Sequence, residues 1–210
     1  MNREYKNTFT NIYKNNVWNS DESRSGPGSE KLVTKTLVKG INSFLSQYEI
    51  SSIFDCPCGD FNWFKNVDYS NVTYLGGDIV KEIIQDNLIN YFNLETNFIE
   101  FDLTSQNMPA SDVWLCRDCF IHLSNKDIKK VLNNFIESHI EYCLLTTMID
   151  VKNNKDILTG QWRLLNLQAP PFNFPIPLEV YEDSKNASRH KVLALWSKEQ
   201  IKTVKWLKYD

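Results

Sequence analysis

Hydrophobic and polar positions follow two periods along this chain. Short apolar runs predict buried strands at residues 51–55, 74–78, 98–103, 112–117, 141–148 and 190–196. Apolar positions spaced close to 3.6 residues apart predict amphipathic helices at residues 30–48, 80–90 and 124–139. Because strands and helices alternate, we expect one α/β domain over residues 1–210, built on a Rossmann-like, doubly wound and mostly parallel sheet of about seven strands.

Two segments depart from this alternation. Residues 1–29 form a polar leader that contains Gly-Pro-Gly-Ser at residues 26–29. Such a stretch is either a linker or a lid, and the neighbouring Trp18 and Arg24 favour a lid. Residues 150–183 are rich in Pro and aromatic side chains without a clear period. Disordered linkers rarely contain so many apolar residues, so we expect an ordered substrate-loop insertion here.

Composition limits the classes of binding partner that we expect for this protein. The chain has 210 residues and a formal net charge of -3, which predicts no broad basic surface and therefore no nucleic-acid partner. No apolar run reaches the length of a membrane span, the first residues lack the core of a secretory signal, and the cysteine count is odd. We therefore expect a cytoplasmic protein without a membrane partner, either a monomer or a homodimer.

Four carboxylates lie at or just after the ends of predicted strands: Asp55, Asp78, Asp102 and Asp118. In doubly wound sheets, ligands bind beyond the carboxyl ends of the strands, so these residues predict a binding crevice. The turn after the first strand reads Cys-Pro-Cys-Gly and has no Gly-x-Gly-x-x-Gly run to hold a pyrophosphate. This favours a ligand without phosphates over a nicotinamide dinucleotide.

The segment at residues 52–63, followed by residues 74–80, resembles the first two motifs of class I S-adenosylmethionine-dependent methyltransferases, although Pro57 and Phe61 stand where glycines are common. The combination of motifs at residues 26–29, 58–63, 116–119, 159–163 and 170–172 is similar to bacterial methyltransferases associated with surface-polysaccharide (capsule) clusters. The resemblance implies S-adenosylmethionine as cofactor and S-adenosylhomocysteine as product. It also implies O-methylation of a small polar acceptor such as a sugar, a phosphate or a glycan precursor. A non-catalytic binding module and a nucleotide- or nicotinamide-dependent Rossmann enzyme remain the alternatives.

Carried over by position, the resemblance implies a set of cofactor-binding residues: Asp55, Cys58, Gly59, Asp60, Asp78, Ile79, Asp102, Leu103 and Arg117. Asp78 would accept the ribose hydroxyls, Asp102 would reach the adenine amine, and Arg117 would lie near the sulfonium. The turn at residues 58–60, with Asp55, would hold the amino-acid end.

Catalytic and substrate-binding candidates lie further along the chain. Asp118 and His122 compete for the role of general base, and we favour Asp118 because it follows the strand end directly. The candidate substrate-binding residues are Trp63, Trp162, Arg163, Asn166 and Gln168, although a purely structural loop explains the last four equally well. Cys56, Cys58, Cys116 and Cys119 have irregular spacing for a metal site, so buried thiols are expected and no metal is assigned.

Overall fold

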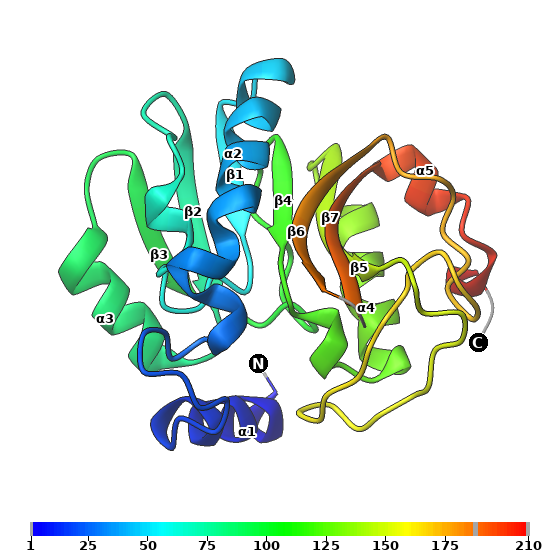
Figure 1. Ribbon diagram of the computed structural model, residues 1–210, viewed down its shortest axis with the longest axis horizontal. Coiled ribbons are helices and arrows are strands. Elements are labelled where there is room, and N and C mark those ends of the chain that lie inside the picture. The colour runs from blue at the N-terminus through cyan, green and yellow to red at the C-terminus, as the bar shows by residue number, and fades with distance from the viewer. Residues whose placement is uncertain (1, 187–188, 209–210) are drawn as a thin grey trace.

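A seven-stranded sheet with helices on both faces forms the centre of the computed structural model, which describes residues 2–186 and 189–208 (Figure 1). The α-helices are α1 (Arg3–Lys14), α2 (Lys31–Gln47), α3 (Lys81–Tyr91), α4 (Asn125–Glu137) and α5 (Lys198–Lys202). The strands are β1 (Ser52–Asp55), β2 (Thr73–Asp78), β3 (Thr96–Glu100), β4 (Val113–Cys116), β5 (Tyr142–Met148), β6 (Glu179–Asn186) and β7 (Arg189–Ser197). Every strand and helix that the apolar pattern predicts is present.

The strand order is β3-β2-β1-β4-β5-β7-β6. Strands β1 to β5 pair in parallel, whereas β7 runs antiparallel to both of its neighbours, β5 and β6. The chain leaves β1 toward β2 on one side and later returns to β4 on the other side, which makes the junction of β1 and β4 the switch point of the sheet. The expected doubly wound, mostly parallel architecture is confirmed, and its crevice lies at this junction.

Alternate strand residues supply two separate cores. Ile53 and Leu115 pack in the cluster under α2, whereas Phe54 and Trp114 pack in the cluster under α4. All four side chains are at most 2% exposed. Because both faces of β1 and β4 are buried, apolar residues follow one another in the sequence, at residues 53–54 and 113–116.

Two elements were not predicted from the sequence. Helix α1 occupies residues 3–14 of the polar leader, and β6 begins within the segment assigned to the substrate-loop insertion. The irregular loop that follows β5 therefore ends before Glu179, earlier than the predicted boundary at residue 183. Strand β3 also ends at Glu100, so Asp102 lies two residues beyond the strand rather than at its end.

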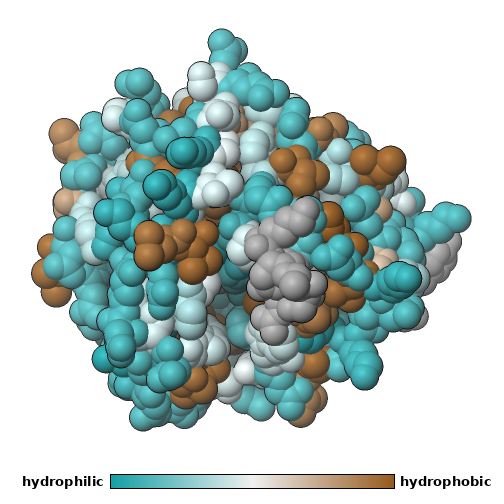
Figure 2. Space-filling view, in the orientation of Figure 1, coloured by the Kyte–Doolittle hydropathy of each residue, from teal (hydrophilic) through white to brown (hydrophobic). Residues whose placement is uncertain are grey.

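The surface carries only small apolar groups on the face seen in Figure 2, where most of the area is hydrophilic. Exposed apolar side chains such as Leu94 and Ile176 lie in separate loops. In the part of the chain that the structure describes, no helix is both long and apolar enough for a membrane span.

Candidate functional site

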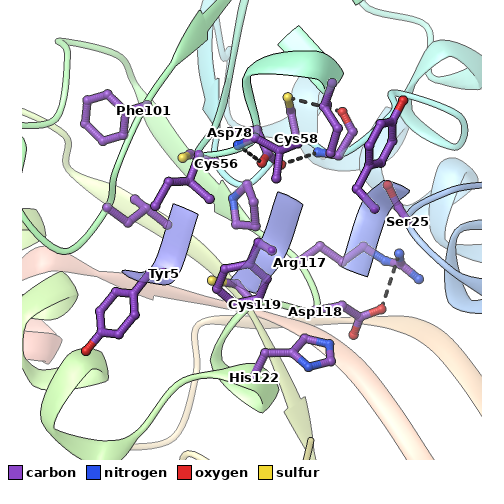
Figure 3. Close-up of a pocket in the computed structure, with 18 of the residues that line it drawn as sticks. Tyr5, Ser25, Cys56, Cys58, Asp78, Phe101, Arg117, Asp118, Cys119 and His122 are labelled. Atoms are coloured by element: carbon purple, nitrogen blue, oxygen red, sulfur yellow. Dashed lines mark hydrogen bonds and ion pairs between the residues drawn. The ribbon is translucent and has the colours of Figure 1, made fainter. Parts of the chain in front are cut away.

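A cavity of about 150 Å³ lies at the carboxyl ends of β1, β2 and β4. This is about ten times the space that one water molecule needs. Figure 3 shows His122 and Asp118 on one side of the cavity, with Asp78, Cys56 and Phe101 on the opposite side. The cavity therefore coincides with the crevice that the strand order requires.

The turn after β1 brings backbone to the cavity wall. Gly59 has a φ of +55°, and a Cβ at this position would collide with Ser25 Oγ, so no other residue fits without a shift. The Gly59 amide donates to Asp78 Oδ2 at 3.2 Å, which ties the turn to the end of β2. The single glycine of the predicted motif is thus the one that the geometry requires.

Asp78 is a buried carboxylate whose environment favours a ligand. Its Oδ1 accepts from the Val80 amide at 2.9 Å, and the residue is 6% exposed while lining the cavity. Burial raises the pKa of Asp78 to about 6, against the lowering effect of the amides of Val80 and Gly59. The group is therefore mainly ionised at neutral pH and can accept further hydrogen bonds. Ile79 lines the cavity beside it.

Asp102 and Leu103 line the same cavity, but the Asp102 carboxylate is already bonded. Asp102 Oδ1 accepts from the Thr104 amide at 2.9 Å and from the Thr104 hydroxyl at 2.6 Å. Its Oδ2 accepts from the Asn2 amide at 2.6 Å and from the Ser105 hydroxyl at 2.8 Å. The expected contact to an adenine amine would have to compete with these four donors.

Asp55 and Asp60 do not line the cavity. Asp55 is 1% exposed, accepts from the Tyr74 hydroxyl at 2.6 Å, and has its pKa raised by burial to about 8. Asp60 instead accepts from the Ser23 hydroxyl at 2.9 Å and from the Arg24 amide at 2.7 Å, which holds the leader over the cavity. We therefore do not retain either carboxylate as a direct cofactor ligand.

Arg117 connects the end of β4 to two distant segments. Its Nε and Nη2 atoms donate to the Asp183 carboxylate on β6 at 2.9 and 2.8 Å, and Nη2 also donates to the Gly28 carbonyl at 2.6 Å. The guanidinium lies over the Trp63 ring at 5.2 Å, and both residues line the cavity. Because Asp183 neutralises Arg117, this residue offers no unpaired positive charge to a ligand.

Asp118 is poorly suited to accept a proton. Burial alone would raise the pKa of Asp118, but the charges of Lys191 and Arg117 outweigh it and lower the pKa to about 2. Lys191 Nζ lies 2.7 Å from Asp118 Oδ2, and the Asp118 backbone has a φ of +52°, a strained conformation. The carboxylate therefore stays ionised, which weighs against our preference for Asp118 as the base.

His122 has the properties that Asp118 lacks. Its Nδ1 lies 3.0 Å from the Gln161 carbonyl, and its ring lies 5.1 Å from that of Trp18. Burial lowers the pKa of His122, partly offset by that carbonyl and by Asp118, so the imidazole is neutral at pH 7. Because a carbonyl oxygen only accepts, Nδ1 carries the proton and Nε2 keeps its electron pair. A neutral imidazole of this kind is an effective proton acceptor.

Helix α1 forms a roof over the cavity, and sequence analysis missed it. Its aromatic side chains Tyr5, Phe9 and Tyr13 lie four residues apart and all line the cavity. No residue of α1 is buried, although the helix is amphipathic. The spacing of these aromatic residues in an otherwise polar segment was the available signal.

The four predicted substrate residues of the loop do not line the cavity. Asn166 Nδ2 donates to the Val151 carbonyl at 2.8 Å, and Asn166 Oδ1 accepts from the Gln168 amide at 2.9 Å. Trp162 is 48% exposed, and Arg163 is buried among loop carbonyls. These contacts order the loop, so we do not carry the four residues forward as substrate ligands.

The cysteines are buried thiols. Burial raises the pKa of Cys56, Cys58 and Cys116 well above the ordinary value, which keeps them protonated. Over residues 2–186 and 189–208, no group of three or more His, Cys, Asp or Glu side chains is arranged to hold a metal ion. Cys58 lines the cavity as an apolar wall residue.

Comparison with solved structures identifies the class of fold to which this chain belongs. No family model and no curated protein sequence matches the chain. Among solved structures, a SAM-dependent methyltransferase from Leishmania major superposes with a TM-score of 0.67 and 11% identity, over 91% of this chain and 83% of that chain. The chain has the class I methyltransferase fold. At such identity the likeness concerns the fold alone.

Two further structures agree. Magnesium protoporphyrin IX methyltransferase from Synechocystis PCC 6803 with bound SAH has a TM-score of 0.60 and 10% identity, over 92% of this chain and 96% of that chain. Human N-acetylserotonin methyltransferase in complex with SAM has a TM-score of 0.54 and 11% identity over 75% of this chain. The present chain spans only about half the length of the human enzyme, since 50% of that chain is covered.

Proposed function

We propose that the protein is an S-adenosylmethionine-dependent methyltransferase. The observation that carries the proposal is the ionised Asp78 carboxylate, which lines the cavity beside the Gly59 turn at the switch point of the sheet. The structural neighbours crystallised with SAM or SAH support the same ligand. The chain also offers no glycine-rich pyrophosphate cradle, which disfavours the nicotinamide alternative.

The residues that line the cavity offer a place for each part of this cofactor. Asp78 would hold the ribose hydroxyls, Ile79 and Leu103 would pack against the adenine, and the turn at Cys58 and Gly59 would approach the amino-acid end. When bound, S-adenosylmethionine supplies the methyl group for a direct displacement.

His122 Nε2 would take the proton from an acceptor hydroxyl, while Asp118 remains a carboxylate throughout. The roof of α1 and the leader loop exclude water from the reacting atoms.

The acceptor that we propose is a small neutral hydroxyl compound, and the sequence resemblance favours a sugar of a glycan precursor. Apart from His122, Arg117 is the one basic side chain among the described residues that line the cavity, and Asp183 already neutralises it. This pairing favours a neutral hydroxyl over a phosphate ester.

Calorimetric titration with S-adenosylhomocysteine tests cofactor binding, and release of that product from S-adenosylmethionine in the presence of candidate sugars tests transfer. The His122→Gln variant should bind the product normally and lose transfer. His139→Gln is the matched control, because His139 does not line the cavity. Absence of binding by the parent protein would refute the proposal, and binding without turnover on any acceptor would favour the non-catalytic module.

A further inference from the structure

Residues 158–163 form a short pairing with the segment that carries His122. The Gly160 amide donates to the His122 carbonyl at 2.8 Å, and the Arg163 amide donates to the Ile121 carbonyl at 3.0 Å. Between these two bonds, the Gln161 carbonyl faces His122 Nδ1 at 3.0 Å. Both the backbone and the ring of His122 are therefore held by the same loop.

The side chain of Arg163 stabilises this pairing through hydrogen bonds outside the cavity. Its Nη1 donates to Asn125 Oδ1 at 2.8 Å and to the Lys155 carbonyl at 2.5 Å, and its Nη2 donates to the Leu123 carbonyl at 2.8 Å. Arg163 is 6% exposed and does not line the cavity. It thus joins the start of α4, the residue after His122 and the far part of the loop without touching the reaction space.

Two neighbouring residues fix the shape of the loop. Gly160 has a φ of +101°, and a Cβ there would come within 2.6 Å of Thr8 Cγ2 on α1. Thr159 Oγ1 accepts from the Ser124 amide at 3.0 Å and donates to Asp127 Oδ2 at 2.5 Å. These contacts anchor the loop directly before the Gln161 carbonyl, which faces the imidazole.

We propose that Arg163 is a positioning residue that acts through the Gln161 carbonyl to hold His122 with its proton on Nδ1 and its electron pair on Nε2. Without that carbonyl, both tautomers are available to a neutral imidazole. Only the Nδ1-protonated form leaves Nε2 able to accept a proton. The inference rests on the proposed function in that it assigns His122 the role of proton acceptor.

Nitrogen-15 labelling of the histidines tests the proposal without any acceptor. Long-range proton–nitrogen correlation spectra distinguish protonated from unprotonated ring nitrogens. The signals of His122 are assigned by their absence in His122→Gln, since the chain has three histidines. Wild-type His122 should show a protonated Nδ1 and an unprotonated Nε2, whereas Arg163→Ala should show both tautomers. Lys155→Ala is the matched control, because Arg163 uses only its backbone carbonyl.

Thr159→Val supplies a second variant that removes the hydroxyl and keeps the side-chain shape. If Arg163→Ala does not fold, as judged by circular dichroism, Thr159→Val decides the question and should also show mixed tautomers. A wild-type His122 protonated on Nε2, or an unchanged tautomer in a folded variant, would overturn the proposal. Binding of S-adenosylhomocysteine should stay unchanged in both variants. Failure of the parent protein to bind it would instead refute the proposed function and leave the tautomer result standing.

Discussion

Replacing Asp78 by Asn removes one negative charge from the cavity and keeps the shape of the side chain. In the wild type, each carboxylate oxygen accepts one backbone amide, from Val80 or Gly59, and has a further electron pair for a ribose hydroxyl. A hydrogen bond to a charged group is worth about 1.5–3 kcal/mol. Because Asn keeps one accepting oxygen, we expect the loss of one such bond, which weakens binding of S-adenosylhomocysteine about 10- to 150-fold.

The raised pKa of Asp78 adds a pH dependence to the same prediction. Burial raises this pKa from 3.8 to about 6, so the folded protein binds a proton there more tightly than the unfolded chain. The contribution of Asp78 to the free energy of unfolding therefore decreases as the pH rises from 3.8 to about 6. A ligand that binds only the ionised form of Asp78 binds more tightly as the pH rises toward the pKa. Below the pKa, its affinity should fall about tenfold per pH unit.

Calorimetry at about pH 7.5 and about pH 5 separates the two effects. The wild type should bind S-adenosylhomocysteine more weakly at the lower pH, whereas Asp78→Asn should bind weakly and almost equally at both. Asp68→Asn removes an exposed carboxylate and serves as the control. Equal affinity of wild type and Asp78→Asn at the higher pH would refute the assignment of Asp78 to the ribose.

Three other predictions address the remaining parts of the site. His122→Gln should lower kcat, measured by release of S-adenosylhomocysteine, by about 10²–10⁴ and leave the affinity for that product unchanged in calorimetry. An equal loss of kcat and of product affinity would point to misfolding. Asp118→Asn should cost about 2 kcal/mol of stability at neutral pH, because the pKa of Asp118 is lowered to about 2 despite its burial. That contribution is present above the ordinary pKa and lost on acidification, so urea unfolding curves of the two proteins should converge toward about pH 2. Hydrogen exchange of the α1 amides should slow when S-adenosylhomocysteine binds, and unchanged exchange would contradict the roof.

The parts of the fold that sequence predicts are those set by local patterns. Strands β1 and β4 are buried on both faces, so their inner residues form short apolar runs in the sequence. Asp78 is the last residue of β2, and Gly59 occupies a turn that no residue with a Cβ fits without a shift. Strand order alone brings Asp78 and Gly59 to the same cavity, because the carboxyl ends of β1 and β2 lie side by side in the sheet.

The parts that sequence does not predict depend on distant partners. The Asp102 carboxylate is bonded by the Asn2 amide, and the pKa of Asp118 is lowered by Lys191, two pairs that lie far apart along the chain. Helix α1 escaped detection because its aromatic stripe lines a cavity in an otherwise polar segment and none of its residues is buried. Strand β6 is polar enough to read as loop and is fixed by pairing with β7.

The contacts that hold α1 over the cavity affect how fast a ligand can enter or leave it. Outside the cavity, polar contacts hold the helix, among them Lys6 with Glu100, Lys14 with Glu82, and Tyr13 with Asp86. Under the proposed function, detachment of this helix would uncover the cavity for release of the spent cofactor, and it would set the turnover rate where it is slower than the chemistry. Because salt screens partly exposed ion pairs, raising the ionic strength should speed that exit. Turnover limited by this step would increase with salt up to the ionic strength at which the roof no longer closes over the cavity.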